Sequence, residues 1–158
     1  MSQSIIDLQK FTILYEQLRQ AVEGLTEEQA KWKESETKWS VVEVLSHLVD
    51  HSIITSFRIR KIVAEASDSV VVNLPAFDQD PWVSSSRANE SSLEEVFSVY
   101  QALLLYNTAF FKRISADNWE KSGVFENGKI YKLSELYDGF VNHVQRHLGQ
   151  IDRIKQAL

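Results

Sequence analysis

Apolar residues recur at three- and four-residue spacing along four long stretches of the chain, which is the period of an amphipathic helix. These stretches span residues 4–23, 41–66, 92–114 and 133–157. In the last of them one apolar stripe contains Leu133, Leu136, Phe140, Val144, Ile151, Ile154 and Leu158. Four such stripes can be buried against one another in a four-helix bundle, so the pattern predicts an all-α fold.

Capping signals mark the expected helix starts. Ser4 precedes the first stretch as an N-cap. Three capping boxes, a Ser or Thr followed three residues later by Glu or Gln, occur at Thr26–Gln29, Ser40–Glu43 and Ser91–Glu94. They predict a short connecting helix after Thr26 and the starts of the second and third long helices.

Two segments interrupt the helical period. Both prolines, Pro75 and Pro81, fall within residues 67–91, which predicts a long loop between the second and third helices. Asn127-Gly128 lies between short apolar runs in residues 122–132, the signal of a tight hairpin turn. We therefore expect a small hairpin before the fourth helix.

Length, charge and composition narrow the class of protein. The 158 residues suit a single domain covering 1–158. A net charge of −5 gives no positive field for a polyanion, so nucleic-acid binding is not expected. The longest apolar run has five residues, Ala102 to Tyr106, and the N-terminus lacks a secretory signal, so we expect a cytoplasmic protein with no membrane segment. Because the chain has no cysteine, any metal must be held by His, Asp or Glu.

The four histidines form two pairs at i, i+4: His47 with His51, and His143 with His147. Random placement would produce two such pairs about once in two thousand sequences of this length. On a helix this spacing puts two imidazoles on one face, where both can reach one metal ion. The pairs therefore predict a metal site, with incidental surface and core histidines as the alternative.

The expected direction of each pair differs. His147 lies within about 20° of the centre of the apolar stripe on the last helix, and His143 about 40° to one side, so both should point into the bundle. The His47 face of the second helix also carries Glu43, Asp50 and Arg58. That face is either in solvent or the wall of a polar cavity in which carboxylates orient the imidazoles.

Other catalytic signatures are missing from the sequence. It has no Glu-x-x-His of di-iron bundles, no His-Glu-x-x-His, no glycine-rich phosphate loop and no Gly-x-Ser-x-Gly elbow. A serine hydrolase therefore has no support.

The segment 39–50, WSVVEVLSHLVD, resembles the W-S-x-x-E-[VIL]-[VIL]-x-H-[LI] motif of the DinB/YfiT-like proteins, and His143-x-x-x-His147 resembles their second signature. Helix order, length and the long second loop extend this similarity over essentially the whole chain. The resemblance implies a DinB-type four-helix bundle that holds one divalent metal ion, zinc or nickel, through His47, His143 and His147.

The same resemblance implies functions. Some proteins of the family are thiol S-transferases that use low-molecular-weight thiols such as bacillithiol or mycothiol, and family members are commonly dimers. We therefore expect a metal-dependent transferase that activates a small thiol, acts on a small-molecule substrate and forms a homodimer. The alternatives are a non-enzymatic metal- or ligand-binding bundle, perhaps stress-related, and a plain structural bundle with incidental histidines.

Several residues near this site lie outside the family pattern. We expect His51 to line the cavity mouth as a catalytic hydrogen-bond or proton-transfer group, rather than to close the site as a fourth ligand. The loop 74–82 lies either over the cavity, with Asp78 and Asp80 at its rim, or in solvent. Arg58 either receives an anionic substrate or pairs with a carboxylate. The four tryptophans are expected to pack in the core and at corners.

Overall fold

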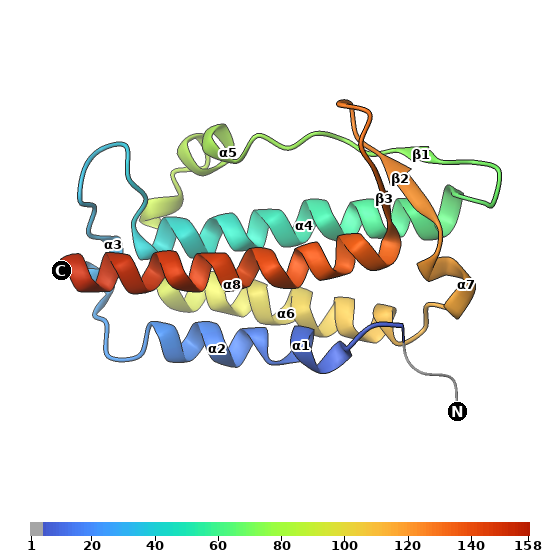
Figure 1. Cartoon of the computed structure of the whole chain (residues 1–158). Coiled ribbons are helices and arrows are strands. Elements are labelled where there is room, and N and C mark those ends of the chain that lie inside the picture. Colours follow the sequence, from blue (N-terminus) through green and yellow to red (C-terminus); the bar gives the residue numbers. More distant parts are fainter. Residues whose placement is uncertain (1–4) are drawn as a thin grey trace.

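In the computed structural model, which describes residues 5–158, long helices run side by side as a bundle (Figure 1). The bundle consists of α1 (Leu8–Thr12) with α2 (Leu14–Ala21), α4 (Val41–Glu65), α6 (Leu93–Phe111) and α8 (Leu133–Ala157). The connections contain α3 (Glu27–Lys31), α5 (Gln79–Ser85), the 3-10 helix η1 (Ala88–Glu90) and α7 (Ala116–Trp119). Three short strands are β1 (Val72–Asn73), β2 (Ser122–Val124) and β3 (Ile130–Lys132).

The four predicted helical stretches are present, with small differences at their ends. The predicted helix over 133–157 coincides with α8, and α4 ends one residue earlier than expected. The first stretch is divided into α1 and α2 at Ile13. Its start also differs, because Asp7 caps α1 by accepting a hydrogen bond from the Gln9 amide at 3.1 Å. Ser4 lies outside the described residues.

Capping boxes start α3 at Thr26 and α4 at Ser40, as predicted. The third box lies one residue later than expected, at Ser92 with Glu95. The reason is that Ser91 already ends η1, where its amide donates to the Ala88 carbonyl at 3.1 Å. The next serine is therefore the first one free to cap α6.

A three-stranded sheet goes beyond the small hairpin that was expected in an otherwise all-α fold. β2 and β3 form the predicted antiparallel hairpin, whose turn contains Gly128 at φ +80°. β1 pairs in parallel with β2, Val72 opposite Gly123, and so ties the segment after α4 to the hairpin. A strand of two residues leaves no alternating pattern in the sequence, so its pairing comes from tertiary contacts.

An aromatic cluster fills the bundle close to the histidines. The Phe11 ring lies 5.0 Å from Phe111 and 5.2 Å from Phe140, both in edge-to-face geometry. Phe140 also packs edge-on to His51 at 5.6 Å. The apolar core therefore extends directly into the wall of the polar site. None of the helices among residues 5–158 is both long and apolar enough to cross a bilayer.

Candidate metal centre

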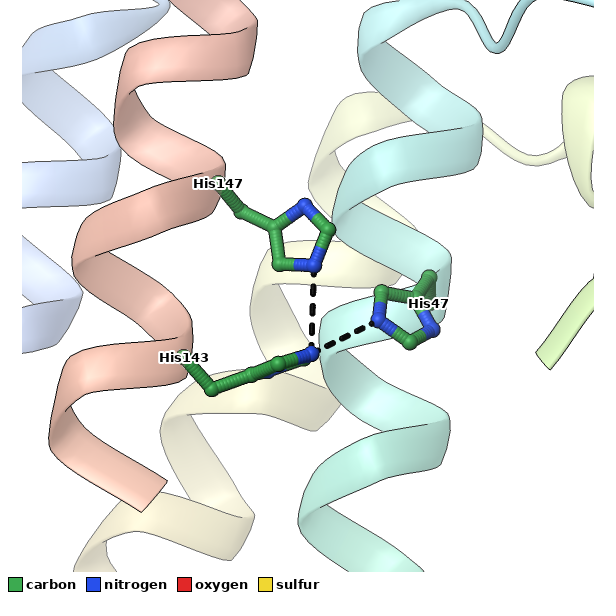
Figure 2. A group of neighbouring side chains, drawn as sticks. All are labelled: His47, His143 and His147. Atoms are coloured by element: carbon green, nitrogen blue, oxygen red, sulfur yellow. Dashed lines mark hydrogen bonds between the residues drawn. The ribbon is translucent and has the colours of Figure 1, made fainter. Parts of the chain in front are cut away.

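Three imidazoles from two helices converge at one point between α4 and α8 (Figure 2). His143 Nε2 lies 3.1 Å from His47 Nε2 and 3.1 Å from His147 Nε2. The three ligand nitrogens lie within 4.8 Å of one another. The structure thus brings together the three histidines that the family resemblance implied as a ligand set.

His47 is fully buried, which answers the question left open for its face of α4. The Trp39 ring lies 5.0 Å from the imidazole, and the Phe77 ring lies parallel to it at 6.1 Å. The capping box at Ser40 fixes the start of α4 two turns before His47, and so fixes the direction of the imidazole. This face is therefore not a solvated surface. The cavity alternative holds only in part, because His51 and Arg58 line a cavity whereas the Glu43 carboxylate pairs with Lys33 and not with an imidazole.

The second nitrogens of the rings have different surroundings. Gln150 Oε1 lies 2.7 Å from His147 Nδ1. Because a carbonyl oxygen only accepts, the His147 proton belongs on Nδ1, and Nε2 keeps its lone pair. The Nδ1 atoms of His47 and His143 are buried and have no hydrogen-bond partner among the described residues.

Burial keeps the histidines uncharged. It lowers the pKa of His47 to about 4 and that of His143 to about 2, with the charges of neighbouring histidines as a smaller cause. Burial also lowers the pKa of His147, partly offset by the hydrogen bond to Gln150. Neutral imidazole is the form that binds metals, so these rings are ready to coordinate at neutral pH.

The donor set fits a divalent ion. Two imidazole nitrogens on a tetrahedral zinc stand about 3.3 Å apart, because each Zn–N bond measures about 2.0–2.1 Å. Both short Nε2 separations, at 3.1 Å, are close to that value. With their protons on Nδ1, the three imidazoles would direct their Nε2 lone pairs toward one ion, and three protein ligands leave a position for water or substrate.

His51 lies next to this group but is not one of the three converging residues. Its ring stacks on His143 at 3.6 Å with an interplanar angle of 18°, and its Nδ1 is 3.5 Å from Thr55 Oγ1. Burial, followed by nearby positive charges, lowers its pKa to about 3. A ring that stays neutral near pH 7 is a weak base, which favours the hydrogen-bonding role over proton transfer.

Cavities open on both sides of the three histidines. The larger has a volume of about 640 Å³ and reaches His51 and His143 between α4, α8 and the hairpin. The smaller, of about 470 Å³, reaches His147 and is lined by Trp39 and Asp80. The centre is therefore accessible to small molecules from two directions.

The loop 74–82 lies over the site. Phe77 lines the larger cavity, and Asp80 lines the smaller one, whereas Asp78 is exposed at the start of α5. Among residues 5–158 no carboxylate pairs with Arg58. Its Nε and Nη2 donate to the Pro75 carbonyl at 3.1 and 2.7 Å, so it anchors this loop to α4.

Sequence reasoning missed three residues beside the centre: Trp39, Phe77 and Gln150. Trp39 packs against the core, as expected, and also on two of the histidines. Trp119 is buried as expected, whereas Trp32 and Trp82 are exposed. The position of Gln150, one turn after His147, is a usable signal for a ligand-orienting partner. Phe77 had no comparable signal, because its place depends on the path of the loop.

The family model that describes the DinB superfamily matches residues 10–151 of this sequence. The chain belongs to the DinB superfamily. No curated protein matches its sequence.

Two solved structures share the fold of this DinB-superfamily chain. YfiT from Bacillus subtilis, described as a probable metal-dependent hydrolase with an unusual four-helix bundle topology, is 18% identical with a TM-score of 0.85. The similarity covers 95% of this chain and 84% of YfiT. A mycothiol-dependent maleylpyruvate isomerase is 10% identical with a TM-score of 0.67, covering 90% of this chain and 60% of that one. At these identities the likeness establishes the bundle topology.

Proposed function

We propose that this DinB-superfamily chain is a metal-dependent enzyme whose His47, His143 and His147 hold one zinc or nickel ion through their Nε2 atoms, and that it transfers a low-molecular-weight thiol to an electrophile. The observation that carries the proposal is the convergence of three neutral imidazoles beside a cavity of about 640 Å³. A site that is open on the cavity side is typical of catalytic and not of structural metal centres.

Each part of the site has a distinct task in this proposal. A bound divalent ion supplies a Lewis acid that lowers the pKa of a thiol. His147 is held in the ligating tautomer by Gln150. Trp39 and Phe77 shield His47 from water. In the transfer the thiol S–H bond breaks and its proton leaves to solvent through the cavity. The sulfur electron pair then forms the C–S bond, while the bond from that carbon to its leaving group breaks and the leaving group departs through the cavity with the electron pair.

The similar structures support the proposal by their descriptions. One is a probable metal-dependent hydrolase and the other a mycothiol-dependent isomerase. A small thiol as the cosubstrate also agrees with the absence of cysteine from this chain, because the nucleophilic sulfur then arrives with the cosubstrate.

The test is a titration of the cobalt-substituted protein with a panel of biological thiols, followed by conjugation assays with the tightest binder. We expect about one ion per chain and a sulfur-to-metal charge-transfer band on addition of a thiol. His147→Ala should abolish stoichiometric metal binding and conjugation. The matched control is Asn142→Ala, an exposed position on the same helix, which should leave both unchanged.

Two results would contradict the proposal. Full metal affinity in His147→Ala would show that the ligand set is wrong. An intact cobalt site with no charge-transfer band for any thiol would remove the transferase role, and the non-enzymatic metal- or ligand-binding bundle would then be the better description.

We also propose a homodimer, supported by large apolar side chains that are exposed on α4 and α6. Phe57 is 54% exposed and Tyr106 62% exposed, and Ile53 and Val99 are exposed as well. The guanidinium of Arg60 lies over the Tyr106 ring at 4.7 Å, which joins the two helices at this face. Sedimentation equilibrium should report twice the mass of the chain.

A further inference from the structure

The larger cavity contains three basic side chains that lack an acidic partner. Arg58, Lys129 and Arg146 line it, and none of them forms an ion pair with a carboxylate in residues 5–158. Arg58 uses Nε and Nη2 on the Pro75 carbonyl, which is a neutral acceptor. The chain as a whole is negatively charged, with a net charge of −5. The charge around this cavity is therefore opposite in sign to that of the whole chain.

The two carboxylates in the same lining do not cancel this charge. Glu135 accepts a hydrogen bond from the Lys132 amide at 2.7 Å as part of the cap of α8, and so belongs to the helix start. Glu126 is exposed on the hairpin turn. The lining therefore has three positive charges against two negative ones.

Two of the cations lie close to the metal centre. Arg58 and Arg146 line the same cavity as His51 and His143. Arg146 lies between His143 and His147 in the sequence of α8, and Arg58 follows His51 by two turns of α4. An anion in this cavity would contact guanidinium groups beside the imidazoles.

Apolar and aromatic side chains make up much of the remaining lining, together with the polar Thr55 and Asn127. The apolar part includes Phe77, Phe125, Phe140 and Leu136. The Arg58 guanidinium lies over the Phe125 ring at 4.8 Å, which orients its planar fork along the cavity wall. Pockets of this volume bury most of a small ligand, with apolar walls for its body and a few polar groups for its orientation.

We infer that the larger cavity binds an organic anion, a carboxylate on an apolar or aromatic body, with the carboxylate held by Arg58 and Arg146 and the body packed on Phe77, Phe125 and Phe140. A guanidinium matches the two oxygens of a carboxylate, which makes arginine the suitable side chain for this contact. The role of the anion as the second substrate of the metal centre rests on the proposed function, whereas its binding does not.

The test is calorimetric titration of the full chain with 3-phenylpropionate and, as an uncharged analogue of similar shape, 3-phenylpropanamide. Both are measured at one ionic strength with zinc-loaded and with metal-depleted protein. We expect the carboxylate to bind at least about tenfold more tightly than the amide in both forms, since hydrogen bonds between charged groups are stronger than those to a neutral acceptor. Arg146→Gln should weaken carboxylate binding about tenfold.

Arg153→Gln is the matched control. Arg153 is an exposed arginine two turns later on α8, and it lines the smaller cavity. It should change the affinity by less than about twofold. Arg58→Lys keeps the positive charge but lacks the planar guanidinium group, so it should weaken carboxylate binding less than Arg146→Gln does. Because Arg58 anchors the loop, the folding of this variant is checked by circular dichroism.

The outcomes separate this inference from the proposed function. Equal affinity for carboxylate and amide, no binding of either, or equal losses in Arg146→Gln and Arg153→Gln would each overturn the anion site. If thiols nonetheless give the cobalt charge-transfer band, the metal-dependent function stands without it. If the carboxylate binds as expected and no thiol gives the band, the anion site stands and the transferase does not.

Discussion

The stability of the metal-free protein should fall steeply as the pH is lowered below the ordinary pKa of histidine. In the folded chain the pKa is about 4 for His47, about 3 for His51 and about 2 for His143. In the unfolded chain each histidine titrates near 6.5. Between these values the unfolded state binds more protons, so stability is fully present above about pH 6.5 and is lost as the pH falls toward the folded values.

The size of the loss follows from the pKa differences. Between about pH 7 and about pH 5, each histidine that stays neutral in the folded state costs about 2 kcal/mol. Part of each lowered pKa comes from the charge of a neighbouring histidine, which acts only once that neighbour is protonated. If two of the three histidines each contribute the full loss of about 2 kcal/mol, the free energy of unfolding should fall by about 4 kcal/mol between the two pH values. This is a large share of the about 5–15 kcal/mol that is typical of a domain.

The assay is urea unfolding of chelator-treated protein at both pH values, followed by circular dichroism. His51→Gln removes one titrating ring and should reduce the pH-dependent loss by about 2 kcal/mol, while Asn142→Ala should leave it unchanged. Comparing variants also cancels Asp50, whose pKa is raised by burial and whose effect has the opposite sign. An unfolding free energy that does not change between the two pH values would refute the reasoning, because the rings would then titrate alike in both states.

Two further predictions concern His51 and the contact between the hairpin and the loop. His51→Ala should keep the metal, with affinity reduced less than about tenfold, because the three converging histidines lose only ring packing on His143 and His47. Loss of the ion to the extent seen in His147→Ala, measured by zinc titration, would make His51 a ligand. Gly123→Ala should destabilise the fold by about 1–3 kcal/mol, because the added Cβ would lie 2.6 Å from Leu74 Cδ1. Urea unfolding measures this cost, and an equal cost in a Leu74→Ala background would exclude that clash.

The local sequence pattern was sufficient to predict most of the helices of the bundle. The periodic stretches predicted the long helices because their length gives many repeats of the 3.6-residue period, and the box at Ser40 predicted the start of α4. The same local rules predicted the hairpin around Gly128. Where two serines compete, as at Ser91 and Ser92, the neighbouring η1 decided which one caps α6, and the capping pattern alone could not.

The i, i+4 spacing of His143 and His147 placed both rings on one helix face, because helix geometry is fixed by sequence distance. The sequence by itself therefore determined the helices and the pairing of histidines within each of them. Only the tertiary structure decided that His47 lies across from His143, that β1 joins the hairpin, and that Phe77 covers the site. These contacts join residues far apart in the chain, and their geometry depends on how α4, α8 and the loop pack together, which no local period encodes.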